Sequence, residues 1–379
     1  MEAAYADGVD GPRIAPAAVA DLVGAPGSEP EVLLGFVPDG PAWLASAHGR
    51  TTMAGYALRG PVASGRLRYL PVRLSAVPRF LHDTRPDVAV VTAVRRGGEL
   101  AFGASVGIGP AAMAAARAVV VEIDQDGPDL GGPLIDGEGA AIVERPLRTR
   151  PVAMPRPPEE LDLAVGRRVA ALLPDRATIQ LGPGGMADAI ALSIDRPVAV
   201  WSGLVTDAVA TLADRDLLLG PATAAYTWGG RAVERLAADG LLRLVPVEVS
   251  HDPSTLAAID RFVACNTALQ VGLDGAANVE RVGGVQVAGI GGHADFCAGA
   301  SRAPGGLSVI ALRSTTRSGA STVVPRVEVV TTPRCDIEVV VTEHGVADLR
   351  GVDDEERAER LVEVAAPEHR PGLRARRDP

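Results

Sequence analysis

The sequence contains no lysine, because all 37 of its cationic side chains are arginine. Without lysine no Schiff base can form, so pyridoxal phosphate and lysine-aldolase chemistry are excluded. Aromatic residues make up only 3% of the chain and leave few rings on which bases could stack. The formal net charge of −10 opposes a broad phosphate-binding surface, which needs clustered cations. We therefore expect no nucleic-acid partner.

Cysteine is also scarce, and long apolar runs are absent. The three cysteines, Cys265, Cys297 and Cys335, have neither metal-ligand spacing nor a disulfide framework. We expect no metal site and a reducing compartment. No apolar stretch reaches the ~18 residues of a membrane span, and the N-terminus lacks the pattern of a signal peptide. These absences predict a soluble, cytoplasmic protein with no membrane partner.

The chain is rich in hydrophobic residues, which make up 47% of its 379 positions. This length exceeds one ordinary core and predicts two domains. Four prolines fall within residues 150–158 and can continue neither a helix nor a central strand. The sequence therefore predicts an N-terminal domain at 1–150, a Pro-rich linker at 151–157 and a C-terminal domain at 158–379.

A strand, a glycine turn, a helix and a strand are expected in succession in residues 101–123 and again in residues 177–201. Strands that alternate with helices predict a mainly parallel sheet with covered faces. One such segment in each half predicts two similarly built α/β domains. We also expect helices at 159–173 and 355–364, strands at 307–312 and 337–341, and a solvated tail from residue 368.

Both glycine turns match the Gly-x-Gly-x-x-Gly/Ala pattern, at residues 107–112 and 182–187. In a dinucleotide-binding fold the next strand ends in an acid that binds ribose. Here the strand at 197–201 ends in Ser202 and Gly203 instead. A Rossmann-type NAD-dependent oxidoreductase is therefore a remote alternative. In a second alternative, these glycines bind no ligand and only allow the strand and the helix to pack closely.

Two further segments carry paired glycine or acidic residues: 291–296, Gly-Gly-His-Ala-Asp-Phe, and 341–351, which contains Glu343. Paired glycines let a backbone come close to a ligand. With Asn-Thr-Ala-Leu-Gln at 266–270 and Ile-Gln-Leu-Gly-Pro-Gly at 179–184, they resemble the acetyl-CoA hydrolase/transferase family. That family includes 4-hydroxybutyrate and succinyl-CoA:acetate CoA-transferases. The resemblance implies two tandem CoA-transferase-like (NagB/RpiA-type) α/β domains with mainly parallel sheets.

The resemblance also implies a chemistry and its participants. In the family, a glutamate attacks an acyl-CoA and a glutamyl-CoA thioester forms, while backbone amides hold the oxyanion. Acyl-CoA and a small carboxylate are the expected partners, CoA is a substrate and not a resident cofactor, and a homodimer is the expected assembly. By resemblance Asn266 and Glu343 support the reacting groups. The resemblance assigns the contacts with the oxyanion and with CoA to Gly291, Gly292, Gln180, Gly182 and Gly184.

The chain departs from the family where the chemistry is expected. The segment 199–208 aligns with the family's nucleophile segment, and Gly203 stands where the glutamate is expected. No glutamate occurs between Glu160 and Glu234, so a small shift of alignment cannot restore it. The family's glutamine after the double glycine is His293 here.

Three functions follow. The protein could hydrolyse a short acyl-CoA, with His293 or Glu343 as general base, because imidazole titrates near neutral pH. It could be an inactive or regulatory protein that binds CoA esters. It could transfer CoA with Asp207 or Glu343 as nucleophile. We further expect Cys297 to be a small buried residue and His251 to lie at the surface.

Overall fold

The structure is a computed structural model that describes residues 1–145 and 157–376. The chain forms two compact units: Met1–Met154, Thr223–Ser250 and Gln286–Gly291 in unit 1, and Pro155–Ala222, His251–Val285 and Gly292–Pro379 in unit 2. Two later segments thus belong to unit 1, whereas the predicted domains were contiguous. The predicted linker lies outside the described residues except for Pro157, so the boundaries 1–150 and 158–379 stay a prediction.

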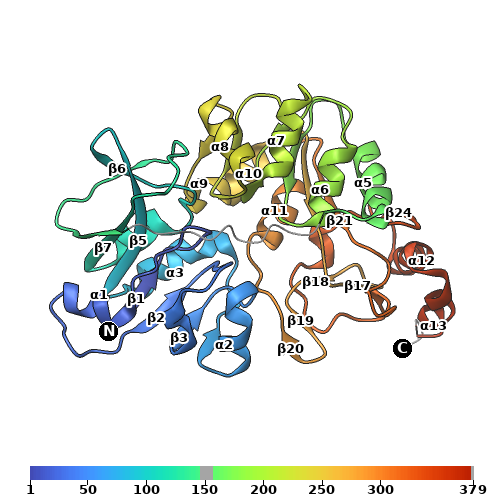
Figure 1. The fold of residues 1–379 in the computed structure, drawn as a ribbon. Helices are drawn as coiled ribbons and strands as arrows, with labels where there is room; N and C mark the ends of the chain where they lie inside the picture. Colours follow the sequence, from blue (N-terminus) through green and yellow to red (C-terminus); the bar gives the residue numbers. More distant parts are fainter. Residues whose placement is uncertain (146–156, 377–379) are drawn as a thin grey trace. The chain divides into compact units, whose positions relative to one another are not determined.

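Unit 1 is built on a nine-stranded sheet (Figure 1). Its central strands are rich in valine and alanine and buried, as expected for parallel strands covered on both faces. Seven strands are in parallel pairs: β4 (Leu67–Tyr69), β3 (Gly49–Thr51), β2 (Glu31–Leu34), β1 (Glu2–Tyr5), β5 (Val88–Arg96), β7 (Ala118–Asp124) and β9 (Ala141–Arg145). Two short strands are antiparallel: β6 (Glu99–Ala101) and β8 (Leu134–Ile135). The helices of this part are α1 (Pro16–Leu22), α2 (Arg59–Ala63), α3 (Val77–Thr84) and α4 (Gly109–Ala115).

The first glycine segment differs from its prediction. The strand expected to precede the turn ends at Ala101 and is antiparallel, and an irregular loop then leads to α4. Two carboxylates organise this loop: Asp10 Oδ2 accepts the Ala104 amide at 2.8 Å, and Asp7 Oδ1 accepts the Ile108 amide at 3.3 Å. Because side chains take these amides, the backbone leaves the sheet. The predicted helix and second strand of this segment are confirmed as α4 and β7.

The later segments of unit 1 are connected to its first residues by a buried hydrogen bond. Tyr226 Oη donates to Asp7, with 3.0 Å to Oδ1 and 2.9 Å to Oδ2. Burial raises the pKa of Asp7, although the Tyr226 hydrogen bond opposes this effect. The elements of these segments are β13 (Ala222–Ala224), β14 (Tyr226–Trp228), α8 (Arg231–Ala238), β15 (Leu242–Leu244) and α9 (Val247–Ser250).

Unit 2 is built on a six-stranded sheet in which only the last strand is antiparallel. The order is β11 (Ala199–Val200), β10 (Thr178–Leu181), β16 (Phe262–Asn266), β21 (Leu307–Ala311), β23 (Val339–Thr342) and β24 (Gly345–Asp348). A small sheet adds β18 (Ala277–Asn278), β17 (Gln270–Gly272) and β22 (Val323–Val324). The short strands β12 (Leu204–Thr206) and β19 (Arg281–Val282) also belong to unit 2, and β20 (Val285–Gln286) begins at the last residue of its segment His251–Val285.

The helices of unit 2 agree with most of the sequence predictions. Helices α5 (Glu160–Leu172) and α6 (Gly185–Ser193) pack on each other, and α11 (His293–Ala300) packs on β16 and β21 (Figure 1). The second strand–turn–helix–strand segment is confirmed as β10, α6 and β11. The remaining helices are α7 (Asp207–Asp214), α10 (Pro253–Ala258), α12 (Asp354–Val364) and α13 (Arg370–Arg374).

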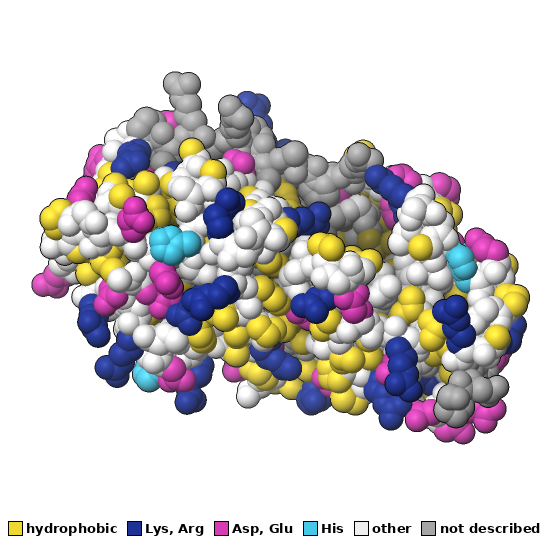
Figure 2. All heavy atoms as spheres, turned by 90° about the horizontal axis from the view of Figure 1, so that it is seen from below, with side chains coloured by type: hydrophobic (Ala, Val, Ile, Leu, Met, Phe, Trp, Pro, Cys, Tyr) yellow, Lys and Arg dark blue, Asp and Glu magenta, His cyan; other side chains and the backbone are white. Residues whose placement is uncertain are grey.

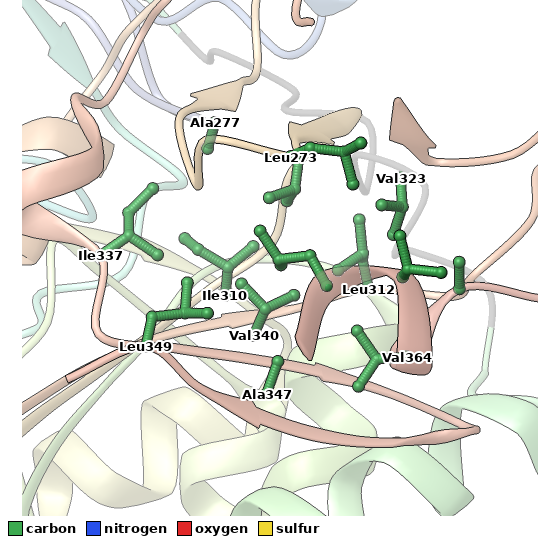
Figure 3. Close-up of a cluster of buried hydrophobic side chains, with 14 of the residues drawn as sticks. Leu273, Ala277, Ile310, Leu312, Val323, Ile337, Val340, Ala347, Leu349 and Val364 are labelled. Carbon is green, nitrogen blue, oxygen red and sulfur yellow. The ribbon is translucent and has the colours of Figure 1, made fainter. Parts of the chain in front are cut away.

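A large apolar cluster lies between the strands of unit 2 and its last helices (Figure 3). Ile310 and Val340 of the sheet are fully buried against Leu361 of α12, and burying each such side chain contributes about 1.5–3 kcal/mol. Leu373 of α13 belongs to the same cluster. The predicted solvated tail from residue 368 is therefore wrong over α13, because an apolar residue anchors it.

Charged side chains of both signs are interspersed on the face that Figure 2 shows. None of the helices in the described part of the chain combines the length and the hydropathy of a membrane span.

Candidate functional site

The second glycine turn, residues 182–184, connects β10 to the first residue of α6. Gly184 has φ of +123°, a conformation that residues with a Cβ rarely adopt. It is also the N-cap of α6, and no side chain among the described residues caps this end of the helix. The amides of a helix N-terminus, together with the helix dipole, favour an anionic or strongly polar group.

A cavity of about 150 Å³ opens at this turn. It is smaller than the pockets of about 300–1,000 Å³ that enclose drug-sized ligands, so it can hold only one end of a molecule as long as CoA. Most of its lining is apolar, and Asn266 and Thr267 add polar groups from the end of β16. The lining residues are Gly182, Pro183, Gly184, Gly185, Met186, Ala187, Ile190, Cys265, Asn266 and Thr267.

Behind the cavity, Asn266 belongs to a buried polar cluster. Asn266 Nδ2 donates to Cys297 Sγ at 3.5 Å. The same sulfur lies 3.8 Å from His293 Nδ1, which is 2.7 Å from Thr332 Oγ1. The structure thus brings together two predicted catalytic residues, Asn266 and His293, through a cysteine between them. Cys297 is buried, as expected.

Burial determines the protonation of this cluster. It lowers the pKa of His293 to about 4, although a backbone hydrogen bond with Thr267 opposes this effect. His293 is therefore neutral at pH 7 and does not titrate near neutrality as expected. Burial raises the pKa values of Cys265 and Cys297 to about 12. Both are thiols at neutral pH, and a thiol is a far weaker nucleophile than a thiolate.

The double glycine at 291–292 immediately precedes helix α11. Gly291 has φ of +55°, and its carbonyl accepts the Leu74 amide at 2.9 Å. The Ile290 amide donates to the Tyr69 hydroxyl at 3.2 Å. Gly292 is the N-cap of α11, and within the described part of the chain no side chain caps this helix end. This geometry suits the predicted oxyanion role, because uncapped helix amides can bind a developing negative charge.

Gly203, at the position expected for the nucleophile, faces two rings. A Cβ atom built on Gly203 would lie 3.0 Å from His251 Nε2 and 3.2 Å from Phe296 Cε2. His251 is only 1% exposed, so the prediction that it lies at the surface is wrong. Its ring packs against that of Phe296, with 4.7 Å between centroids. Burial lowers the pKa of His251 to about 3.

Two other predicted site residues, Glu343 and Gln180, do not belong to the Asn266 cluster. Glu343 lies in the turn between β23 and β24, where Oε2 accepts the Ser314 amide at 2.9 Å and Oε1 accepts the Ser314 hydroxyl at 2.6 Å. Its hydrogen bonds thus go to Ser314 and not to the Asn266 cluster. Gln180 is buried on β10, and its Oε1 has no hydrogen-bond partner among the described residues.

Comparison with known proteins decides the family. The acetyl-CoA hydrolase/transferase C-terminal domain matches residues 232–377. The chain is 30% identical, over 338 residues, to a 4-hydroxybutyrate coenzyme A transferase of Clostridium kluyveri, covering 83% of this chain and 78% of that protein. The chain belongs to the acetyl-CoA hydrolase/transferase family. The resemblance found in the sequence is therefore confirmed.

Solved structures agree on the fold. RipA from Yersinia pestis is similar with a TM-score of 0.88 and 24% identity, over 99% of this chain and 93% of that one. A 4-hydroxybutyrate CoA-transferase from Porphyromonas gingivalis gives a TM-score of 0.75 and 24% identity, over 99% and 92%. The predicted α/β class with mainly parallel sheets is confirmed. Membership of this family leaves the dinucleotide alternative without support.

Proposed function

We propose that this protein binds short acyl-CoA thioesters and hydrolyses them with water, without a glutamyl-CoA intermediate. The observation that carries the proposal is at position 203. Glycine stands there where the sequence resemblance predicts the family's glutamate, and His251 and Phe296 lie beside it. Membership of a family of acetyl-CoA hydrolases and transferases supports the choice of substrate class.

The cavity at α6 supports a short acyl group. Its volume of about 150 Å³ and its apolar lining from Met186, Ile190 and Cys265 suit a small hydrocarbon chain. Asn266 in the cavity lining carries an amide that can donate to a carbonyl oxygen. The N-terminus of α6 offers a favourable site for negative charge.

In the proposed reaction, water attacks the thioester carbonyl, the C–S bond breaks, and a carboxylic acid and free CoA are formed. Asn266 and the amide of Gly292, both in unit 2, are proposed to stabilise the oxyanion, as amide donors do in acyl transfer. A base with a pKa of about 4 is poorly matched to neutral pH. His293 is therefore assigned to positioning, through its contacts with Thr332 and Cys297.

We assign Glu343 a structural role, because both of its carboxylate oxygens accept hydrogen bonds from Ser314. Gln180, Gly182 and Gly184 remain candidates for contact with the CoA ester near the start of α6. A cytoplasmic location and a homodimer stay predictions from sequence and family.

The test is CoA release from acetyl-CoA and butyryl-CoA, measured with and without acetate. Hydrolysis predicts release of CoA that does not depend on acetate, and no covalent enzyme–CoA thioester after hydroxylamine or borohydride trapping. Acetate-dependent exchange would establish transfer and contradict the proposal.

A second function, binding of CoA esters without turnover, is favoured by one observation. Within the Asn266 cluster, the Cys297 side chain is a thiol and the His293 side chain a neutral imidazole at pH 7. Calorimetric titration with acetyl-CoA separates the two functions. Binding without CoA release would identify the silent binder, and an absence of binding would contradict both.

A further inference from the structure

Two glycines from separate parts of the chain face the same two rings, His251 and Phe296, which we call the ring pair. A Cβ atom on Gly292 would lie 2.5 Å from His251 Nε2 and 2.9 Å from Phe296 Cε2. A Cβ atom on Gly203 would lie 3.0 Å and 3.2 Å from the same atoms. Glycine, which has no Cβ atom, therefore fits beside the ring pair at both positions.

The ring pair is held in place by the core. His251 and Phe296 are 1% and 3% exposed. Phe296 also packs near Phe262 of β16, with 6.3 Å between ring centroids, and belongs to a buried cluster with Leu256 and Ala264. Close-packed interiors yield little space, and inserting atoms into them typically costs about 1–3 kcal/mol. Both rings beside position 203 are buried, so a side chain there could be accommodated only if the rings moved within a packed core.

We propose that the ring pair determines the reaction of this site by occupying the space beside residue 203. Gly203, which stands where the resemblance predicts glutamate, and His251 are then matched to each other. A glutamate restored at position 203 would be displaced from its working geometry while His251 remains.

The consequence for chemistry rests on the proposed acyl-CoA function. A glutamate at position 203 would attack the thioester carbonyl and release CoA thiolate, forming a mixed anhydride. The thiolate would then attack the glutamyl carbonyl and release the acyl carboxylate, leaving a glutamyl-CoA thioester. The ring pair closes this route, so water remains as the acyl acceptor.

The packing claim is tested by thermal unfolding of Gly203→Ala, His251→Ala and the double variant. Gly203→Ala should lower Tm by about 2–6 °C in the wild-type background and by clearly less in the His251→Ala background. Gly182→Ala is the matched control, because a Cβ there meets nothing within 4 Å. It should leave Tm unchanged or slightly higher and be additive with His251→Ala. His251→Asn replaces His251→Ala if the latter does not fold.

Equal Tm losses from Gly203→Ala in the two backgrounds would overturn the proposal. So would a Gly203→Ala variant as stable as Gly182→Ala. These measurements need no catalysis. Failure of the wild type to release CoA would therefore contradict the proposed function and leave the packing result standing.

The chemical arm compares Gly203→Glu with Gly203→Glu/His251→Ala after incubation with acetyl-CoA. Intact-mass analysis and hydroxylamine release detect the glutamyl-CoA thioester. The adduct is expected only in the double variant. An adduct in the single variant at the same level would overturn the proposal, because the ring pair would then not exclude a working glutamate.

Discussion

At the residue scale, Asn266 connects the cavity to the buried cluster behind it. If its amide stabilises the oxyanion, Asn266→Ala should lower kcat for CoA release by about 10²-fold, as removal of one such donor does elsewhere. KM should change much less, because the interaction strengthens in the transition state. Gln125→Ala, an exposed amide of unit 1 that bonds Glu144, is the control. A tenfold rise in KM with unchanged kcat would contradict the assignment.

Two buried histidines should make stability depend on pH. Burial lowers the pKa values of His251 and His293 to about 3 and about 4, against about 6.5 in the unfolded chain. Below pH 6.5 the unfolded chain binds protons that the folded chain does not, so stability falls as pH falls. Each histidine should contribute a loss of about 2 kcal/mol between pH 6.5 and 5.

This effect is measured as the difference in free energy of unfolding between wild type and His251→Asn. The variant should be less stable at pH 7.5 because it loses packing, and the difference should shrink by about 2 kcal/mol at pH 5. His82→Asn is the control, because His82 is exposed. A difference that stays constant over this range would show that His251 is not held neutral by the fold.

At the scale of elements, α5 is joined to the chain after β21 by Arg313. The guanidinium donates to both oxygens of Asp162, at 2.7 and 2.6 Å, and to Glu159 at 3.0 Å. The side chain of Asp162 is only 9% exposed, and that of Arg313 23%, so solvent screening is partial. Removing the cation would leave a largely buried carboxylate unpaired.

Arg313→Met should therefore lower the free energy of unfolding by about 2 kcal/mol, between the values for buried and for surface pairs. Urea unfolding followed by circular dichroism measures the loss. Arg350→Met breaks the pair with Asp348, whose side chains are 53% and 42% exposed, and should cost less than about 1 kcal/mol. Equal losses in the two variants would refute the argument.

Elements with a local sequence signal could be predicted, and those that depend on distant contacts could not. The second glycine segment has apolar strands, a glycine turn and a helix in immediate succession, and its predicted structure was correct. In the first segment only the strand before the turn was wrong, because the loop after Ala101 is organised by Asp7 and Asp10, which lie far back in the chain. His251 was missed for the same reason, since its ring contacts Phe296 and faces Gly203. The motif residues Asn266 and His293 both contact Cys297, whereas the sequence predicted only that Cys297 is a small buried residue.

At the scale of the whole molecule, unit 1 depends on residues that come late in the chain. The Tyr226 hydroxyl donates to Asp7 across 219 positions of sequence, and the Val247 amide donates to the Gly107 carbonyl at 3.1 Å. The Asp7 carboxylate also accepts hydrogen bonds from the amides of Phe36 and Ile108. A fragment that ends at the predicted boundary loses Tyr226 and Val247 but keeps the buried carboxylate.

Residues 1–150 alone should therefore fail to form a native unit. Loss of the Tyr226 hydrogen bond to the buried Asp7 carboxylate and of the packing from Thr223–Ser250 should leave a compact state that binds ANS and lacks a near-UV dichroism signal. Tyr226→Phe in the full chain is the control, because it removes one buried hydrogen bond and costs only about 1–3 kcal/mol. That variant should fold cooperatively. A fragment 1–150 that unfolds cooperatively with native-like dispersion would show that the contiguous boundary is a true domain boundary, and that the later segments only dock onto a unit already formed.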